Sequence, residues 1–236
     1  MKKYILVISV LQFIAVYNLQ AQSNSVSTSG KWGQQIFLSD VNGRAFENKY
    51  ADINGSAYLF PDFKFATIEL ADGRKYANVK ARLNLVENEV NFIASNGEEG
   101  YIGKGMVHTI SFNDTTKQGI KNLSFQTGFP KTDNQTVIQF YQVLATGKIA
   151  IVKSISKNIE ERLNELSGEK SKEFAVRENI YLQIGGELKR VKKEASFFLE
   201  AMADQKDTIN TYIKTNKINF KAEDQLIKLV EYYNSL

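Results

Sequence analysis

The sequence predicts an α+β protein: a mostly antiparallel β meander, folded as a sandwich, a curved sheet or an open barrel, followed by three short α-helices. Three observations predict this class. Apolar residues alternate with polar ones over Val79–Leu85, which is the period of a half-buried strand. All 15 glycines and both prolines lie at or before Gly186, whereas residues 187–236 contain neither. These last residues instead repeat apolar side chains at helical spacing.

Four segments follow from these patterns. Residues 1–21 are predicted to be a signal peptide, and residues 22–50 a polar leader that forms a loose arm. Residues 51–191 make the antiparallel β body. We expect the helical tail, residues 192–236, to pack on this body, because three short helices cannot bury their apolar stripes alone.

The first segment has the layout of a secretory signal: Lys2 and Lys3, an apolar run over Tyr4–Tyr17, and small residues around Ala21. The run is shorter than the ~20 residues that cross a bilayer, so an uncleaved anchor is the weaker alternative. Cleavage after Ala21 leaves 215 of the 236 residues, without a membrane span. We expect a periplasmic, outer-envelope or secreted protein.

Turn residues divide the β body into short strands. Asp72-Gly73 predicts a hairpin, Asn96-Gly97 a further turn and Gly185-Gly186 another hairpin. Asn158–Leu166 is charged, with apolar residues at helical spacing, and is predicted as a short helix or mobile loop. The remaining expected strands are Thr67–Leu70, Val90–Ala94, Tyr101–Phe112, Ile120–Gln126, Thr136–Leu144, Lys148–Ile155, Phe174–Ile184 and Glu187–Val191.

The tail carries three amphipathic stripes. Asp204 is the predicted N-cap of the second helix, with Asp207 three residues on, and Asn216 its C-terminal stop. The apolar stripes, in helix order, are Ala195, Phe198, Leu199 and Met202; Ile209, Tyr212 and Ile213; and Leu226, Ile227, Val230 and Tyr233.

Composition excludes several kinds of chemistry. Without cysteine the chain has no disulfide, Cys-ligated metal or cysteine nucleophile, and one histidine rules out sites that need two imidazoles. The net charge of +4 falls to +2 once Lys2 and Lys3 leave with the signal peptide, so no nucleic-acid partner is expected.

The candidate site residues are few. His108 lies on a strand face with Met106, Ile110 and Phe112, where a partly buried histidine bonded to backbone is the simpler interpretation. Aromatic side chains crowd residues 32–65; they fill a core or bind a ligand. The hypothetical ligand contacts are therefore Trp32, Tyr58 and His108.

The glycine-rich stretch 96–105 lacks the Ser or Thr of a phosphate loop, and it is interpreted as a turn. We identify no catalytic residue, no metal ligand and no cofactor site. Paired carboxylates for hydrolysis stay open, since such pairs meet only in the fold.

Several segments together resemble uncharacterised secreted proteins of Bacteroidetes-type bacteria. They are Asn54–Leu59, Ala66–Leu70, Asp72-Gly73 with Tyr76, Leu83–Leu85, and the ending Tyr232-Tyr233-Asn234-Ser235-Leu236. Ala57 and Leu83 depart from the family pattern, which has Pro and an aromatic residue there. The resemblance implies an envelope location and the β-then-helix layout, and no activity.

The leading hypothesis is an exported, non-catalytic cell-envelope protein that binds another macromolecule. One alternative is a carrier of a lipid or other apolar small molecule inside a curved sheet, which requires an apolar cavity. A weaker alternative is a carboxylate-dependent hydrolase.

Overall fold

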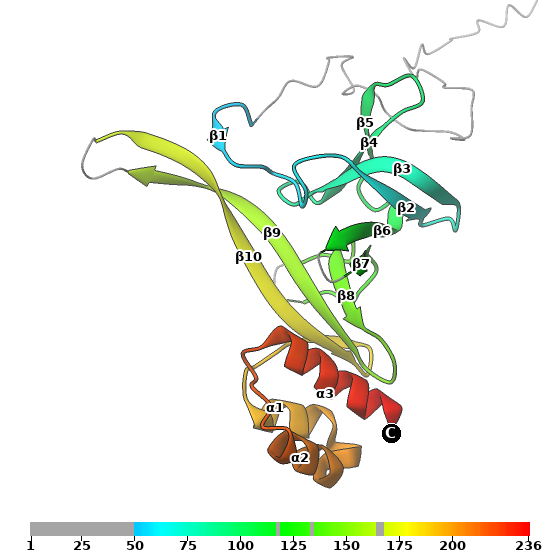
Figure 1. The fold of residues 1–236 in the computed structure, drawn as a ribbon, viewed down its shortest axis with the longest axis vertical. Helices are drawn as coiled ribbons and strands as arrows, with labels where there is room; N and C mark the ends of the chain where they lie inside the picture. Colours follow the sequence, from blue (N-terminus) through cyan, green and yellow to red (C-terminus); the bar gives the residue numbers. More distant parts are fainter. Residues whose placement is uncertain (1–49, 117–118, 133–134, 164–167) are drawn as a thin grey trace, which may run out of the picture.

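The computed structural model describes residues 50–116, 119–132, 135–163 and 168–236. It confirms the predicted fold class: one open, curved and mostly antiparallel sheet, with three α-helices at the C-terminus (Figure 1). The helices lie at one end of the sheet, against the base of a long hairpin. The hairpin's other end projects away from the rest of the molecule.

The strand order across the sheet is β1-β10-β9-β8-β7-β6-β2-β3-β4-β5, with β11 added to β10. Every pairing is antiparallel except that of β1 with β10. The strands are β1 (Ile53–Asn54), β2 (Lys64–Leu70), β3 (Lys75–Asn84), β4 (Glu89–Ile93), β5 (Glu99–Ile102), β6 (Val107–Thr116), β7 (Gly119–Gln126), β8 (Tyr141–Ala145), β9 (Ala150–Leu163), β10 (Lys170–Ile184) and β11 (Glu187–Arg190).

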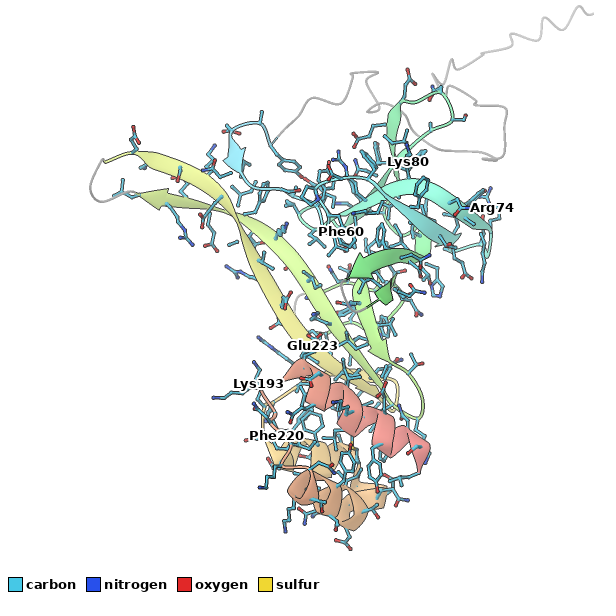
Figure 2. The ribbon with its side chains drawn as sticks, in the orientation of Figure 1. Phe60, Arg74, Lys80, Lys193, Phe220 and Glu223 are labelled. Atoms are coloured by element: carbon cyan, nitrogen blue, oxygen red, sulfur yellow. The ribbon has the colours of Figure 1, made fainter. Side chains whose placement is uncertain are left out.

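The predicted alternation in β3 is confirmed: Val79, Ala81 and Leu83 are buried, while Lys80 is exposed. The three buried residues belong to a first apolar cluster, formed mainly by β2 to β7. Phe60 covers this cluster from the loop before β2, with its ring 5.5 Å from that of Phe112 (Figure 2). The expected continuous strand Tyr101–Phe112 is wrong, because a turn closed by the Met106 N–H to Gly103 C=O bond separates β5 from β6.

The hairpin turn at Gly185-Gly186 joins β10 to β11 as predicted, with Ile184 opposite Glu187. Both glycines have positive φ, 58° and 80°, which the tight two-residue turn requires and glycine adopts without strain. The buried side chains near this end form a small cluster that includes Tyr141, Val152 and Tyr181.

The predicted helix or loop at Asn158–Leu166 is wrong over Asn158–Leu163, because β9 continues through Leu163. The segment pairs antiparallel with β10, with Ile159 opposite Phe174. Ile159 and Leu163 stand at i and i+4, a spacing that shares one face in a helix and also in a strand. Local periodicity therefore did not separate the two structures; pairing with β10 decided it.

The tail contains α1 (Ala195–Ala201), a 3₁₀ turn (Ala203–Gln205), α2 (Lys206–Thr215) and α3 (Glu223–Ser235). Their stripes meet the base of β9 and β10 in a second cluster. Phe220, on the link between α2 and α3, stacks on Phe198 there, with ring centroids 5.5 Å apart (Figure 2). Of the predicted inward positions of α3, Leu226, Val230 and Tyr233 are buried, and so is Leu229, which the prediction left out.

Asn216 ends α2 as predicted. The N-cap prediction for Asp204 is wrong: α2 begins after Gln205, without a side-chain cap. The Asp204 carboxylate instead accepts a hydrogen bond from the Tyr233 hydroxyl, 2.9 Å away. The residue ties α3 to the 3₁₀ turn, a long-range role that the local sequence does not indicate.

Candidate functional site: the projecting hairpin

The projecting hairpin, by which we mean residues 156–163 of β9 and 170–177 of β10, is the candidate site. The pairing of β9 with β8 ends at Ser154, but β9 and β10 continue together until Leu163 stands opposite Lys170. Figure 1 shows this part reaching away from the sheet and the helices. Its side chains divide into two faces, because successive residues of a strand point to opposite sides.

One face of the projecting hairpin carries its large apolar side chains, interleaved with Lys157, Glu161, Lys170 and Lys172. Ile159, Leu163 and Val176 are 44%, 59% and 55% exposed. Ile159 lies directly opposite Phe174 and diagonal to Val176, and Leu163 follows beyond Glu161. The same face is buried nearer the sheet, where Ile155 belongs to the first cluster. We call this exposed continuation of the core the apolar face.

The opposite face carries paired charges. Arg162 forms an ion pair with Glu173, and Arg177 pairs with Glu160 at 3.2 Å. All four groups are on the surface, where such pairs contribute little to stability. They keep this face hydrated, so the projecting hairpin is amphipathic.

Three hydrogen bonds of Lys157 hold the root of the projecting hairpin to neighbouring parts of the chain. The Lys157 ammonium donates hydrogen bonds to the C=O groups of Ser56 and Tyr58, at 2.6 and 2.8 Å. Its backbone N–H bonds to the Leu85 C=O at 3.0 Å. Burial lowers the pKa of Lys157. The lysine therefore fixes the loop before β2 against β9.

On the other strand, β1 adds to β10 in parallel, with Ile53 opposite Lys172. A hydrogen bond from Lys172 lowers the pKa of Asp52, whose carboxylate lies 3.1 Å from the ammonium. Tyr50 packs its ring against Phe174, edge to face at 5.5 Å. The β10 edge of the projecting hairpin thus already accepts one extended segment.

Tyr58, a predicted ligand contact, lies against a cation of its own chain. The Arg82 guanidinium stands 3.6 Å from the Tyr58 ring centroid and 4.3 Å from that of Phe63. Arg82 also bonds to the Glu99 carboxylate, at 2.8 Å. Burial raises the pKa of the Tyr58 phenol, and the Arg82 charge opposes part of the rise. The arrangement joins the loop before β2 to β3 and β5.

His108 is half-buried as predicted, but its predicted face and backbone bond are wrong. The pairing of β2 with β6 shifts between Glu69 opposite Thr109 and Leu70 opposite Val107. This bulge turns Val107 inward and leaves His108 beside Gln126. The His108 Nε2 lies 3.5 Å from the side-chain amide nitrogen of Gln126. Bulges break the alternation from which strand faces are predicted.

A surface hollow of 340 Å³ lies at the base of the sheet, lined by Gln126, Phe129, Lys148 and Gly185 among others. It is open and mixed in polarity, unlike the enclosed apolar cavity of a lipid carrier. The structure does not bring Tyr58 and His108 together at it; neither residue lines it. The carrier and hydrolase alternatives stay predictions.

Ala21 and Trp32 lie outside the described residues, as does the part of the predicted helix after Leu163. Within the described part of the chain, no group of three or more His, Cys, Asp or Glu side chains is placed to hold a metal ion. No helix there is long and apolar enough to cross a membrane. Comparison with known protein families, curated proteins and solved structures finds no match to this chain.

Ile159, Leu163 and Val176 were not among the predicted site residues. One signal for them exists in the sequence: the odd positions Ile155, Ile159 and Leu163 share one face if the segment is a strand. Their exposure depends on where β8 begins, at Tyr141 opposite Ser154, which the segment itself does not encode.

Proposed function

We propose that this chain is an exported, non-catalytic cell-envelope protein, which binds another macromolecule through the apolar face of the projecting hairpin. The apolar face carries the proposal. Single exposed apolar side chains are ordinary on protein surfaces, but grouped ones on a projecting element are typical of interaction sites. Here Ile159, Val176 and the half-buried Phe174 adjoin one another, whereas the opposite face has Ala175 as its one apolar residue between 156 and 163 and between 170 and 177.

Burial of this face would gain free energy that the isolated chain does not realise. Full burial of a wholly exposed Leu, Ile or Val side chain yields about 1.5–3 kcal/mol, and Ile159, Leu163 and Val176, which are about half exposed, would yield about half of that each. The charged residues on the same face, such as Lys172 and Glu161, border the apolar side chains, as polar residues do at protein interfaces.

Site-specific photocrosslinking in growing cells tests the proposal. A photoreactive amino acid in place of Val176 is expected to give adducts with a heavier envelope component. The matched control is Ser171, which is exposed on the same strand but belongs to the charged face. Equal adducts at both positions, or no adduct with any other molecule at Val176, would overturn the proposal.

Export is tested separately. The mature protein is expected to begin at Gln22 and to lack residues 1–21. Intact mass and N-terminal sequencing of protein from the envelope fraction measure this directly. A chain that keeps Lys2 and Lys3, or that stays with the cytoplasmic fraction, would contradict the export part.

A further inference from the structure

The outer edge of β9 in the projecting hairpin presents backbone groups with no pairing strand among the described residues. The Lys157 N–H bonds outward, to the Leu85 C=O, and not to β10. In an extended strand the N–H and C=O groups of every second residue point the same way, so those of Ile159, Glu161 and Leu163 also point outward. Among the residues that the structure describes, no strand pairs with β9 beyond this bond.

The side chains along this edge are self-complementary in antiparallel order. The sequence from 159 to 163 reads Ile-Glu-Glu-Arg-Leu. When a second copy pairs with Glu161 opposite its own equivalent, Ile159 meets Leu163 and Glu160 meets Arg162, each twice. Cross-strand apolar pairs and opposite charges stabilise such a ladder, whereas like charges oppose it.

We propose that a second copy of this chain pairs with the outer edge of β9, antiparallel about a twofold axis at Glu161, to give one sheet that runs through both molecules. In this register the outward N–H and C=O groups of residues 159, 161 and 163 form the backbone ladder. Both Glu160–Arg162 pairs lie on the charged face, and both Ile159–Leu163 pairs lie on the apolar face.

The one like-charge contact of this register is compensated. Glu161 meets its equivalent on the axis, but the Lys170 ammonium of the same copy lies 3.9 Å from each Glu161 carboxylate. Charged residues on an edge strand normally prevent pairing with other chains. Here their order favours one partner and one register, so the edge rejects other strands and accepts its own copy.

The pairing also completes the apolar face, and in this respect the inference rests on the proposed function. Within one molecule, Glu161 separates Leu163 from Ile159. In the pair, Leu163 of the second copy lies directly beside Ile159, which extends the group formed with Phe174 and Val176. The contact is far smaller than the ~800 Å² per partner of a stable interface, so we expect weak, concentration-dependent self-association.

Sedimentation of the mature protein with a charge-swap series tests the register. Glu160→Arg and Arg162→Glu each place like charges opposite each other, and each is expected to raise the dimer dissociation constant ~tenfold or more. The double variant restores both intermolecular pairs and is expected to return within ~threefold of the unchanged protein. It does not restore the Arg162–Glu173 and Glu160–Arg177 pairs inside each copy.

Disulfide trapping supplies a second readout. The chain has no cysteine, so a single introduced cysteine can form a disulfide only between copies. Glu161→Cys is expected to give covalent dimers under mild oxidation, since directly opposed residues in an antiparallel ladder bring their Cα atoms to ~5.5 Å. Ser171→Cys, on β10, is the control: the two β10 strands would be three spacings apart, ~14 Å, and should not crosslink.

The outcomes are separable from those of the proposed function. An unchanged protein that stays monomeric at the highest soluble concentration, a double variant without rescue, or equal crosslinking at 161 and 171 would overturn the self-pairing. Adducts of Val176 with another molecule would persist in that case. A dimer whose Val176 adducts contain only this chain would instead overturn binding of another macromolecule and leave the pairing intact.

Discussion

Gly147 shows how closely the end of α3 fits the turn between β8 and β9. A Cβ atom at this position would lie 2.8 Å from the Asn234 Cβ and closer still to its amide group. The Asn234 side chain accepts a hydrogen bond from the Ile149 N–H, at 3.1 Å, and donates one to the Ile149 C=O, at 2.9 Å. The amide thus mimics a paired strand, and only glycine leaves space for it.

Gly147→Ala is therefore expected to lower the free energy of unfolding by about 1–3 kcal/mol, as overpacked sites do. Urea denaturation measures the change. Asn234→Gly removes every side-chain atom that a Cβ at position 147 would meet, as well as both hydrogen bonds, so in that background Gly147→Ala should cost less than half as much. Additive losses would show that the contact with Asn234 is not the cause.

Lys157 anchors the loop before β2 to β9. Replacement by Met leaves the Ser56 and Tyr58 carbonyls without their donor, and we expect a loss of about 1–3 kcal/mol in unfolding free energy. Lys228→Met is the control, because Lys228 is exposed and its ion pair with Asp224, at 3.9 Å, lies on the surface and contributes little to stability. An equal effect of both substitutions would contradict the anchoring role.

The pH dependence has a definite sign. Burial lowers the pKa of Lys157 below the 10.5 of a free lysine, so between these two values the unfolded chain binds more protons. The cost of holding the charge is fully present below the lowered pKa and is relieved as pH rises through it. The stability of the unchanged protein relative to Lys157→Met should therefore rise with pH as 10.5 is approached.

At the scale of the element, α1 offers a matched pair of neighbours. Phe198 is fully buried and stacks on Phe220, whereas Phe197 is only partly buried at the edge of the same cluster. Phe198→Ala should cost about 3–5 kcal/mol, and Phe197→Ala clearly less. Thermal unfolding of both variants measures the difference. Similar losses for the two variants would contradict the view that burial of Phe198 in the cluster sets the cost.

Elements with strong periodicity were predictable. The alternation of β3, the glycine turn before β11 and the inward side of α3 all appear in the sequence, because each depends on residues near in the chain. The strand at Asn158–Leu163 was not predictable, since its spacing fits two periods and β10 decides between them. The bulge at His108 and the tether at Asp204 likewise depend on distant partners.

The candidate site follows the same division. The residues of the apolar face are visible as an alternation once a strand is assumed, but β9 is left without β8 there because β8 begins only at Tyr141, opposite Ser154. The predicted contact Tyr58 fits an aromatic-binding role by residue type alone. Its packing on Arg82 was not predictable, because it depends on the loop before β2 lying against β3 in the fold.

At the scale of the whole molecule, β9 touches every part of the interior that the structure describes. Ile151 packs with the helices, Val152 with the cluster around Tyr141, and Ile155 with the cluster of β2 to β7. The projecting hairpin continues the same strand but meets none of these clusters beyond Ile155. One strand therefore connects three packed regions and then leaves them.

This path sets how amide hydrogens exchange with solvent. The amides of residues 151–155 should exchange only through global unfolding, because their release would break all three clusters at once. Those of Ile159, Glu161 and Leu163 point outward and should exchange quickly in dilute solution. Hydrogen exchange followed residue by residue checks both, and protection at 151–155 well below the global value would show that the clusters open independently. A single strand would then carry the slowest and the fastest backbone amides of the fold within about a dozen residues of each other.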